Sequence, residues 1–242
     1  MWANNETGVL FPIREIGEIC RSHGVLFHTD AVQATAKVPI AVEGMSVDFL
    51  SVSSHKFGGP KGVGVLYVRQ GVPFHPYFWG GSQERGRRAG TENVAAIVGM
   101  GRAAELAAER VGQFAERVGK LRDRFEGTIL DALTDVRING QAAERVPNTS
   151  NLCFHNVESE ALLMELDRQG IQASGGSACS TGSAKPSRVL VEMGLSVREA
   201  FSSVRFSLGW NNTEDEIDRA AAAVVAAVRR IREKLPTALV AE

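Results

Sequence analysis

Apolar residues in the first third of the chain fall into short runs that are separated by polar or glycine-rich stretches. Runs of this kind lie at residues 25–29, 47–52 and 63–68. Their length and their β-branched residues predict strands. Between Pro12 and Gly24, apolar residues recur every three or four positions instead, which predicts a helix. This alternation of strands and helices favours parallel pairing, so we expect a mostly parallel sheet with helices on both faces.

The second half of the chain predicts a long helix followed by a separate group of short elements. Residues 93–133 are rich in alanine and charge, and we expect this helix to bend or break at its glycines, with a domain boundary near Gly112. Strands are expected at residues 136–138, 151–154, 171–173 and 204–208, and helices at 159–169, 186–193 and 214–235. The predicted fold class is α/β over residues 1–111, with a smaller α+β domain over residues 112–242.

Composition narrows the classes of protein to consider. The chain has 242 residues, of which 44% are hydrophobic, as in ordinary globular proteins. Its 27 basic and 28 acidic residues give a net charge of −1, so no electrostatic reason exists to expect nucleic acid or an anionic membrane as a partner. No apolar run has the length of a membrane span and the first residues lack a secretion signal pattern, which favours a cytoplasmic protein.

The three cysteines show neither the spacing of a zinc site nor an even number for pairing. Cys20 and Cys153 lie within a helix pattern and a strand pattern, so we expect both in a core. Cys179 lies instead among small residues at positions 174–184. No side chain in that stretch is large enough to anchor it, so we favour an exposed loop with a reactive thiol.

A candidate cofactor site follows from two charged residues that each come directly after an apolar run. Lys56 follows the run at 47–52 and precedes a glycine-rich stretch, and Asp30 follows the run at 25–29. A lysine alone in such a place is usually a surface residue. Pyridoxal phosphate, however, needs a lysine amine for its aldehyde and a carboxylate for its ring nitrogen. The pair therefore predicts a pyridoxal-phosphate site.

One further stretch and one further residue carry charge that a regular helix or strand does not explain. Residues 80–92 are rich in glycine and arginine, which predicts either a solvated loop or a contact to phosphate. Arg205 interrupts a strand pattern of apolar and hydroxyl residues. Its planar guanidinium either faces solvent from an edge strand or clamps a carboxylate.

Five short motifs together resemble those of a known family. They are ANNETG at residues 3–8, FHTDAVQ at 27–33, SSHK at 53–56, RAGTEN at 88–93 and GSAC at 176–179. In this order they resemble the cysteine desulfurases of the NifS/IscS type, which are class V, fold-type-I pyridoxal-phosphate enzymes. The resemblance extends from residue 1 to about residue 235, and Trp2 and residues 7–12 look closer to the nitrogen-fixation branch.

The resemblance implies a role for each predicted site residue. The catalytic residues would be Cys179, Lys56 and His55. Pyridoxal 5′-phosphate would be held by Asn5, Asp30, Gln33, Ser53, His55, Lys56 and Thr91. Among these, Asn5 and Gln33 would contact the phenolic oxygen of the ring, and Ser53 and His55 the phosphate. Thr91 would reach the cofactor phosphate of the partner subunit in a homodimer, and Arg205 would bind the substrate carboxylate.

The same resemblance implies the reaction and its partners. L-cysteine would give L-alanine and a persulfide on Cys179, which would pass its sulfur to an iron–sulfur scaffold protein, here for nitrogenase maturation. During transfer, Cys179 would also act as a transient iron–sulfur ligand through its persulfide. The resemblance further implies that the family's N-terminal third or more precedes Met1. We therefore expect Met1 to be an internal methionine, and the isolated chain to bind cofactor weakly or not at all and to show little desulfurase activity.

Other functions stay open at the level of sequence. A pyridoxal-phosphate aminotransferase or a selenocysteine lyase would use the same lysine and carboxylate without needing Cys179 as the sulfur acceptor. An inactive fragment is a third alternative. A cofactor-free cysteine hydrolase, from a different class, would pair Cys179 with His155 or His55.

Overall fold

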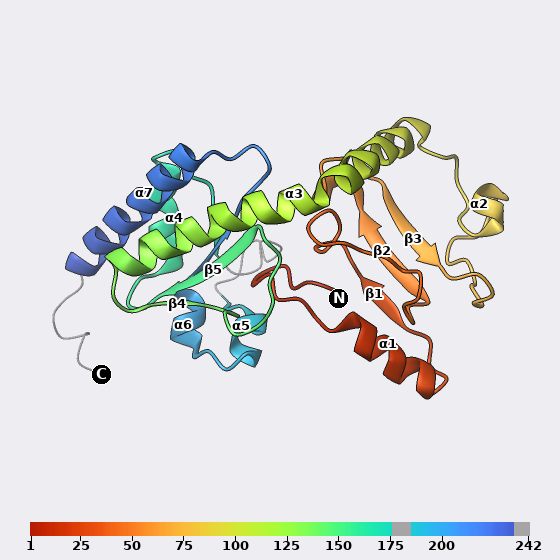
Figure 1. Ribbon diagram of the computed structural model, residues 1–242, viewed down its shortest axis with the longest axis horizontal. Coiled ribbons are helices and arrows are strands. Elements are labelled where there is room, and N and C mark those ends of the chain that lie inside the picture. Colours follow the sequence, from red (N-terminus) through yellow and green to blue (C-terminus); the bar gives the residue numbers. More distant parts are fainter. Residues whose placement is uncertain (176–184, 235–242) are drawn as a thin grey trace. The chain divides into compact units, whose positions relative to one another are not determined.

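A computed structural model of the chain describes residues 1–175 and 185–234. Its contacts divide the chain into two compact units (Figure 1). Unit 1 contains Met1–Ala3 and Leu10–Gln113, and unit 2 contains Asn4–Val9 and Phe114–Glu242. The assignment of a cofactor domain and a cysteine-loop domain to residues 1–111 and 112–242 stays a prediction. Within the described residues, no helix is both long and apolar enough to cross a membrane.

Unit 1 is built on a small mixed sheet in the order β1-β2-β3. Its elements are α1 (Ile13–Ser22), β1 (His28–Asp30), β2 (Phe49–Ser53), the 3₁₀ helix η1 (Ser54–Lys56), β3 (Gly64–Val68) and the short α2 (Gln83–Gly86). β1 is parallel to β2, whereas β2 is antiparallel to β3. The expectation of a mostly parallel sheet is therefore wrong. A parallel β2–β3 pair would need a long crossover connection, and only residues 54–63 join these strands.

The first strand is shorter than its apolar pattern predicted. Val25 and Leu26 are 57% and 54% exposed, and the strand begins only at His28. The cause is local, because the amide of Phe27 donates to a carboxylate oxygen of Asp48 rather than to a neighbouring strand. The carbonyl of Phe27 accepts from the amides of both Asp48 and Phe49. Regular pairing therefore starts one residue later.

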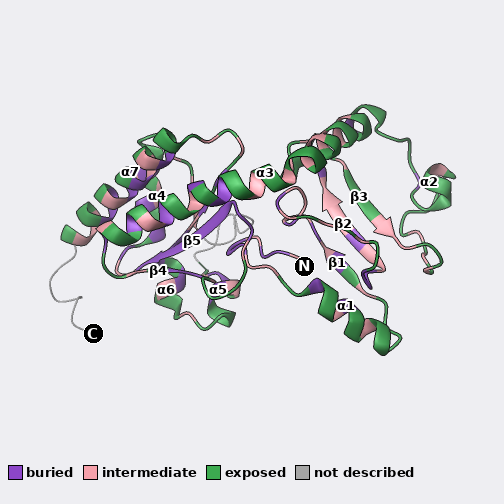
Figure 2. Ribbon diagram, in the orientation of Figure 1, coloured by how far each residue is buried: buried purple, intermediate pink, exposed green. Residues whose placement is uncertain are grey.

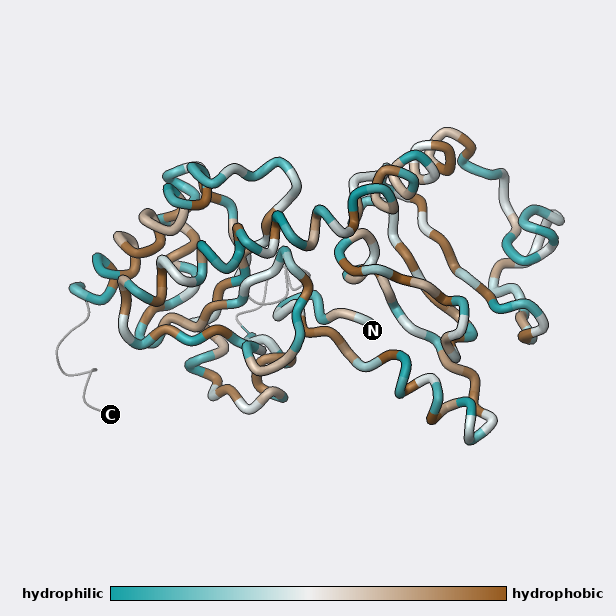
Figure 3. The backbone as a smooth tube through the Cα atoms, viewed as in Figure 1, coloured by the Kyte–Doolittle hydropathy of each residue, from teal (hydrophilic) through white to brown (hydrophobic). Residues whose placement is uncertain are grey.

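The core of unit 1 is small, and much apolar surface lies outside it. Its buried members are Ile13, Ala31, Met45, Val47 and Leu50. Figure 3 shows hydrophobic positions along β2 and β3, yet Figure 2 shows β3 partly exposed, and Val65 and Leu66 are 45% and 46% exposed. These neighbouring residues point to opposite faces, so the expected cover by helices on both faces does not extend to β3.

Helix α3 (Val94–Ala132) runs without interruption for 39 residues. The expected break at its glycines does not occur, because a single glycine costs a helix only about 1 kcal/mol. Gly99 has a packing reason, since a Cβ atom there would lie 2.7 Å from Cγ of Pro60. The part of α3 up to Gln113 belongs to unit 1 and the part from Phe114 belongs to unit 2.

Unit 2 contains an antiparallel sheet in the order β4-β5-β7-β6. Its elements are β4 (Val136–Ile138), β5 (Thr149–Phe154), α4 (Ser159–Asp167), β6 (Ser174–Gly175), α5 (Arg188–Glu192), α6 (Val197–Phe201), β7 (Ser203–Ser207) and α7 (Glu214–Glu233). Figure 1 shows the C-terminal part of α3, α4 and α7 along one side of this sheet. The strand expected at 171–173 is wrong, because β6 begins only at Ser174. Cys153 in β5 is buried as predicted, whereas Cys20 is only half-buried.

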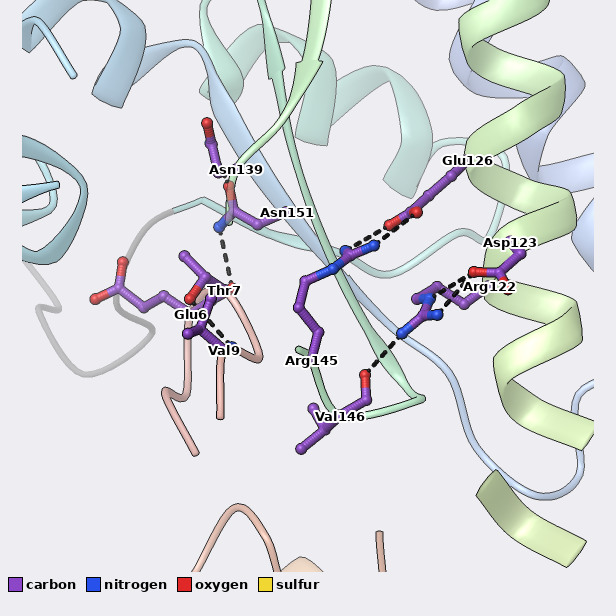
Figure 4. Close-up of polar contacts among 10 residues, drawn as sticks. All are labelled: Glu6, Thr7, Val9, Arg122, Asp123, Glu126, Asn139, Arg145, Val146 and Asn151. Carbon is purple, nitrogen blue, oxygen red and sulfur yellow. Dashed lines mark hydrogen bonds and ion pairs between the residues drawn. The ribbon is translucent and has the colours of Figure 1, made fainter. Parts of the chain in front are cut away.

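Residues 4–9 are bound into unit 2 as an added strand-like segment. The carbonyl of Gly8 accepts from the amide of Val146 (2.8 Å), and Nδ2 of Asn151 donates to the carbonyl of Glu6 (3.1 Å). Val9 forms an antiparallel bridge with Arg145, whose guanidinium makes two hydrogen bonds of 2.8 and 2.9 Å to the Glu126 carboxylate. Figure 4 shows this cluster between the segment and α3.

Candidate functional site

The predicted cofactor residues of unit 1 gather at one edge of its sheet. Asp30 ends β1 and lies opposite Ser51 of β2, to which β1 is parallel. β2 ends two residues later at Ser53, and η1 then presents His55 and Lys56. Because the ends of parallel strands lie at the same edge, the structure brings Asp30, Ser53, His55 and Lys56 together. Lys56 and His55 are exposed there, whereas Asp30 is half-buried.

Hydrogen bonds orient the polar groups at this edge. Oδ1 of Asp30 accepts from the amide of Val32 at 2.8 Å, which fixes the carboxylate at the start of the next turn. Oγ of Ser53 lies 2.9 Å from Nδ1 of His55. On the same strand, Oγ of Ser51 lies 2.7 Å from Nε2 of His28. Sequence reasoning gave no role to His28, although its place in the FHTDAVQ motif pointed to this edge.

Gln33 lies in the turn that follows Asp30, where a buried lysine holds it. Nζ of Lys37 donates to the backbone carbonyl of Gln33 at 2.9 Å and to its Oε1 at 3.2 Å. Burial, and then the charge of Lys56, lower the pKa of Lys37 from 10.5 to about 8. Sequence reasoning missed Lys37; its signal was the spacing of four residues from Gln33 across a turn.

This donor set fits pyridoxal phosphate. The hydroxyl of Ser53, the imidazole of His55 and the ammonium of Lys56 are suited to an anionic phosphate and to an aldehyde. The Asp30 carboxylate is suited to a protonated ring nitrogen. Thr91 is exposed just before α3. In the described residues, no group of three metal-ligating side chains gathers to hold an ion.

The other predicted binding residues lie in unit 2. Arg205 is on β7, which has β5 on one side and β6 on the other, so it does not lie on an edge strand. One of its terminal nitrogens donates to the carbonyl of Asn5 at 2.7 Å. Its Nε is buried and has no hydrogen-bond partner among the residues that the structure describes. Such an unsatisfied donor on a cation favours a contact to an anion.

The segment that carries Cys179 lies outside the described residues, but both of its flanks belong to unit 2. On one flank, Ser174 pairs with Arg205 in the sheet. On the other, Oγ of Ser187 donates to Oε2 of Glu6 at 2.5 Å and accepts from the amide of Leu190 as the cap of α5. Glu6 is 3% exposed and follows Asn5 directly. One flank is therefore paired with the predicted substrate-binding residue, and the other is bonded to the neighbour of a predicted cofactor-binding residue.

A cavity of about 760 Å³ also lies in unit 2, on a different face of the sheet. It is lined by Phe206 and by one side of α7, whereas Arg205 is not among its lining residues. Neighbouring residues of a strand point to opposite faces, which separates this cavity from the Arg205 guanidinium. The thiol of Cys153 is no alternative nucleophile, because burial raises its pKa.

Known proteins resemble this chain over most of its length. The family model described as aminotransferase class-V matches residues 1–220. The cysteine desulfurase of Trichormus azollae is 48% identical over 236 residues, and the cysteine desulfurase NifS of Azotobacter vinelandii is 48% identical over 240 residues. In both comparisons, 98% of this chain matches 59% of the relative. The chain thus spans about three fifths of the length of these curated relatives.

Solved structures show the same partial coverage. A NifS-like protein from Rickettsia africae matches 96% of this chain with 60% of its own, at 34% identity and a TM-score of 0.84. Another NifS-like protein matches 95% of this chain with 60% of its own, at 36% identity and a TM-score of 0.86.

Proposed function

This chain belongs to the aminotransferase class-V family, among its NifS-like cysteine desulfurases, and from that premise we propose that it takes part in removing sulfur from L-cysteine. The family uses pyridoxal phosphate. The observation that supports the proposal is that Asp30 ends β1 and Lys56 follows the end of β2, at the common edge of these two parallel strands. A cofactor-free hydrolase has no use for this pair of groups.

The predicted site residues would have separate tasks toward the cofactor. At the edge of the unit 1 sheet, Lys56 would hold the aldehyde carbon, Asp30 would keep the ring nitrogen protonated, and Ser53 with His55 would hold the phosphate. Gln33, and Asn5 from unit 2, would contact the phenolic oxygen, and Thr91 would reach the phosphate of the partner subunit. When bound, the cofactor withdraws electrons from the substrate carbon that carries the amine. Lys56, His55 and Asp30 then hold or move the protons that this chemistry requires.

Arg205 orients the substrate. Its guanidinium forms paired hydrogen bonds with the carboxylate of L-cysteine, a geometry that a planar fork favours. Support comes from its position on an inner strand and from its buried Nε, which lacks a partner within the described residues. The hydrogen bond from Arg205 to the Asn5 carbonyl holds the guanidinium in place.

Cys179 accepts the sulfur. Its thiolate attacks the sulfur atom of L-cysteine, a sulfur–sulfur bond forms, and the substrate carbon–sulfur bond breaks. The substrate carbon gains a proton in place of sulfur, so L-cysteine and one thiol give L-alanine and one persulfide. This balance needs no external oxidant or reductant. The product persulfide then donates sulfur to an iron–sulfur scaffold protein.

The finer biological role is also a proposal. We propose a homodimeric, cytoplasmic enzyme that supplies sulfur for nitrogenase maturation; the similarity to the cysteine desulfurase NifS supports only the choice of this branch. The exposed apolar side chains of unit 1, such as Tyr77 and Trp79, support a subunit interface there. Aminotransfer and selenocysteine cleavage are the competing reactions.

The experiment is a covalent map of the cofactor site. The chain is incubated with pyridoxal phosphate, reduced with borohydride and digested, and we expect the reduced label on Lys56. A matched Lys61→Ala variant should keep the label, whereas Lys56→Ala should lose it. A label on another lysine would overturn the assignment.

The second arm of the experiment tests the nucleophile. In Cys179→Ala, we expect the label on Lys56 to remain while sulfide release from L-cysteine falls to background. Cys153→Ala is the matched control and should keep both. A Cys179→Ala chain that still makes L-alanine and sulfide at the normal rate would refute the sulfur-acceptor role.

A further inference from the structure

Lys37 is a buried lysine for which the proposed mechanism has no task. It is 7% exposed, and among the described residues its Nζ donates hydrogen bonds to Gln33 alone, at 2.9 Å to the backbone carbonyl and 3.2 Å to Oε1. Within residues 1–175 and 185–234, no carboxylate forms an ion pair with it. A buried ammonium without a carboxylate is costly to the fold. A functional role of Lys37 would offset this cost in stability.

The contact with Lys37 determines the orientation of the Gln33 side-chain amide. An ammonium has three donors and no acceptor, so only the amide oxygen of Gln33 can face it. This contact settles which end of the amide points to Lys37, a choice that geometry alone leaves ambiguous. The amide nitrogen Nε2, with its two donors, must then point away from Lys37. The phenolic oxygen of the cofactor ring is an acceptor and requires such a donor.

We propose that Lys37 is a positioning residue that holds Oε1 of Gln33 and thereby presents Nε2 of Gln33 to the phenolic oxygen of pyridoxal phosphate. The inference rests on the proposed function and deepens it. Lys37 acts through Gln33 and does not itself touch the cofactor. The lowered pKa of Lys37 agrees with its buried position close to the charge of Lys56.

A purely structural role is the alternative. Lys37 also donates to the backbone carbonyl of Gln33, and that contact alone would close the turn formed by residues 31–38. The two roles differ in one observable property, because only the positioning role couples the charge of Lys37 to the side-chain amide of Gln33. Lys56 is the one charged neighbour that lowers the pKa of Lys37, so it must be controlled.

The first measurement needs no cofactor. The carbon-13 signal of the Gln33 side-chain carbonyl is identified by its loss in Gln33→Leu and followed from pH 6 to pH 11. We expect it to titrate with a midpoint near pH 8. Lys37→Met should abolish this titration, Lys61→Met should leave it unchanged, and Lys56→Met should move its midpoint upward. A Gln33 signal that does not change in Lys37→Met would overturn the inference.

The second measurement is a double-mutant cycle on cofactor affinity. Lys37→Met and Gln33→Leu should each weaken binding of pyridoxal phosphate by about tenfold, the effect of one hydrogen bond. The double variant should bind no more weakly than Gln33→Leu alone. Fully additive losses, or normal affinity in Lys37→Met, would overturn the inference.

The two proposals fail in different ways. If neither Lys37→Met nor Gln33→Leu alters affinity, the cofactor contact of Gln33 is wrong and the inference falls with it. The proposed function is then judged by the borohydride label on Lys56, which does not depend on Gln33. If a large excess of pyridoxal phosphate, chosen to offset the weak binding expected of this chain, leaves no reduced label on Lys56, the proposed function fails, while the carbon-13 titration still decides the contact between Lys37 and Gln33.

Discussion

The two units differ in the size of their buried apolar clusters. In unit 2, twenty buried apolar residues form one cluster between the sheet and the helices, and Phe125 and Phe206 pack with ring centroids 4.9 Å apart. In unit 1, the corresponding cluster has five buried members. The polar edge that carries Asp30 and Lys56 therefore lies in the unit with less buried apolar surface. At this edge, local hydrogen bonds orient Asp30, Ser53 and His55.

The apolar surface of unit 1 sharpens this contrast. Tyr77, Trp79 and Val98 are 88%, 81% and 66% exposed. Large exposed apolar side chains can mark surfaces that another protein covers. Unit 1 therefore has, beside its smaller buried cluster, exposed side chains that the proposed subunit interface would cover.

Matched core deletions test the comparison most strongly. Leu152→Ala in unit 2 should cost about 4 kcal/mol of unfolding free energy, because the surrounding side chains are too constrained to fill the cavity. Leu50→Ala in unit 1, which removes the same atoms from a smaller cluster, should cost about 2 kcal/mol. Urea unfolding followed by hydrogen exchange and mass spectrometry reads the two units separately. Equal losses of unfolding free energy in the two variants would contradict the proposed difference between the two cores.

A smaller effect is expected from the ion pair that holds residues 4–9 in unit 2. Arg145 and Glu126 have side chains only 9% and 7% exposed, so Glu126→Gln leaves a buried, uncompensated guanidinium. We expect a loss of about 3 kcal/mol, with faster hydrogen exchange in residues 4–9.

The matched control for this prediction is Asp218→Asn. It breaks the bidentate pair with Arg124 on the surface of the same unit, where solvent screens the charges. Asp218→Asn should change stability little. If Glu126→Gln were equally mild, the role of the buried pair in holding the segment would be refuted.

The last effect concerns unit 1 and its dependence on pH. The pKa of Lys37 falls from 10.5 to about 8 on folding, so between these values the unfolded chain binds the proton more tightly. Unit 1 should therefore gain stability as pH rises from 8 to 10.5, by on the order of 3 kcal/mol. Lys37→Met should lack this rise. Urea titrations at pH 7.5 and pH 10.5 measure the unfolding free energy of the unsubstituted chain and of Lys37→Met. The same change with pH in both chains would contradict the prediction.

The sequence predicted the elements whose signals are local. The apolar spacing after Pro12 matches α1, and Thr213 with Glu216 forms the capping box that begins α7. A second capping box, Ser196 with Glu199, begins α6 and could have located that helix. Such signals depend on neighbours within one turn, so they are visible without a fold.

Strand direction and pairing were predicted less well, because they depend on the length of the segments that connect the strands. The antiparallel β2–β3 pair follows from the short link between them, whereas apolar runs alone carry no direction. For the site, strand ends identified Asp30 and Lys56. The tie between Glu6 and Ser187 joins residues 181 positions apart, and no local pattern contains it.

The long sequence separation between residues 4–9 and some of their partners in unit 2 has a consequence for how the chain folds as it is synthesised. Arg205 donates to the carbonyl of Asn5, 200 residues earlier. A ribosome that adds roughly 5 to 20 residues per second needs about 10 to 40 s to produce that stretch. Meanwhile the bridge between Ala3 and Leu10 and the hydrogen bond from Asn4 to Val9 can form at once. We therefore expect a nascent chain to carry this loop already closed when the strands that receive it emerge.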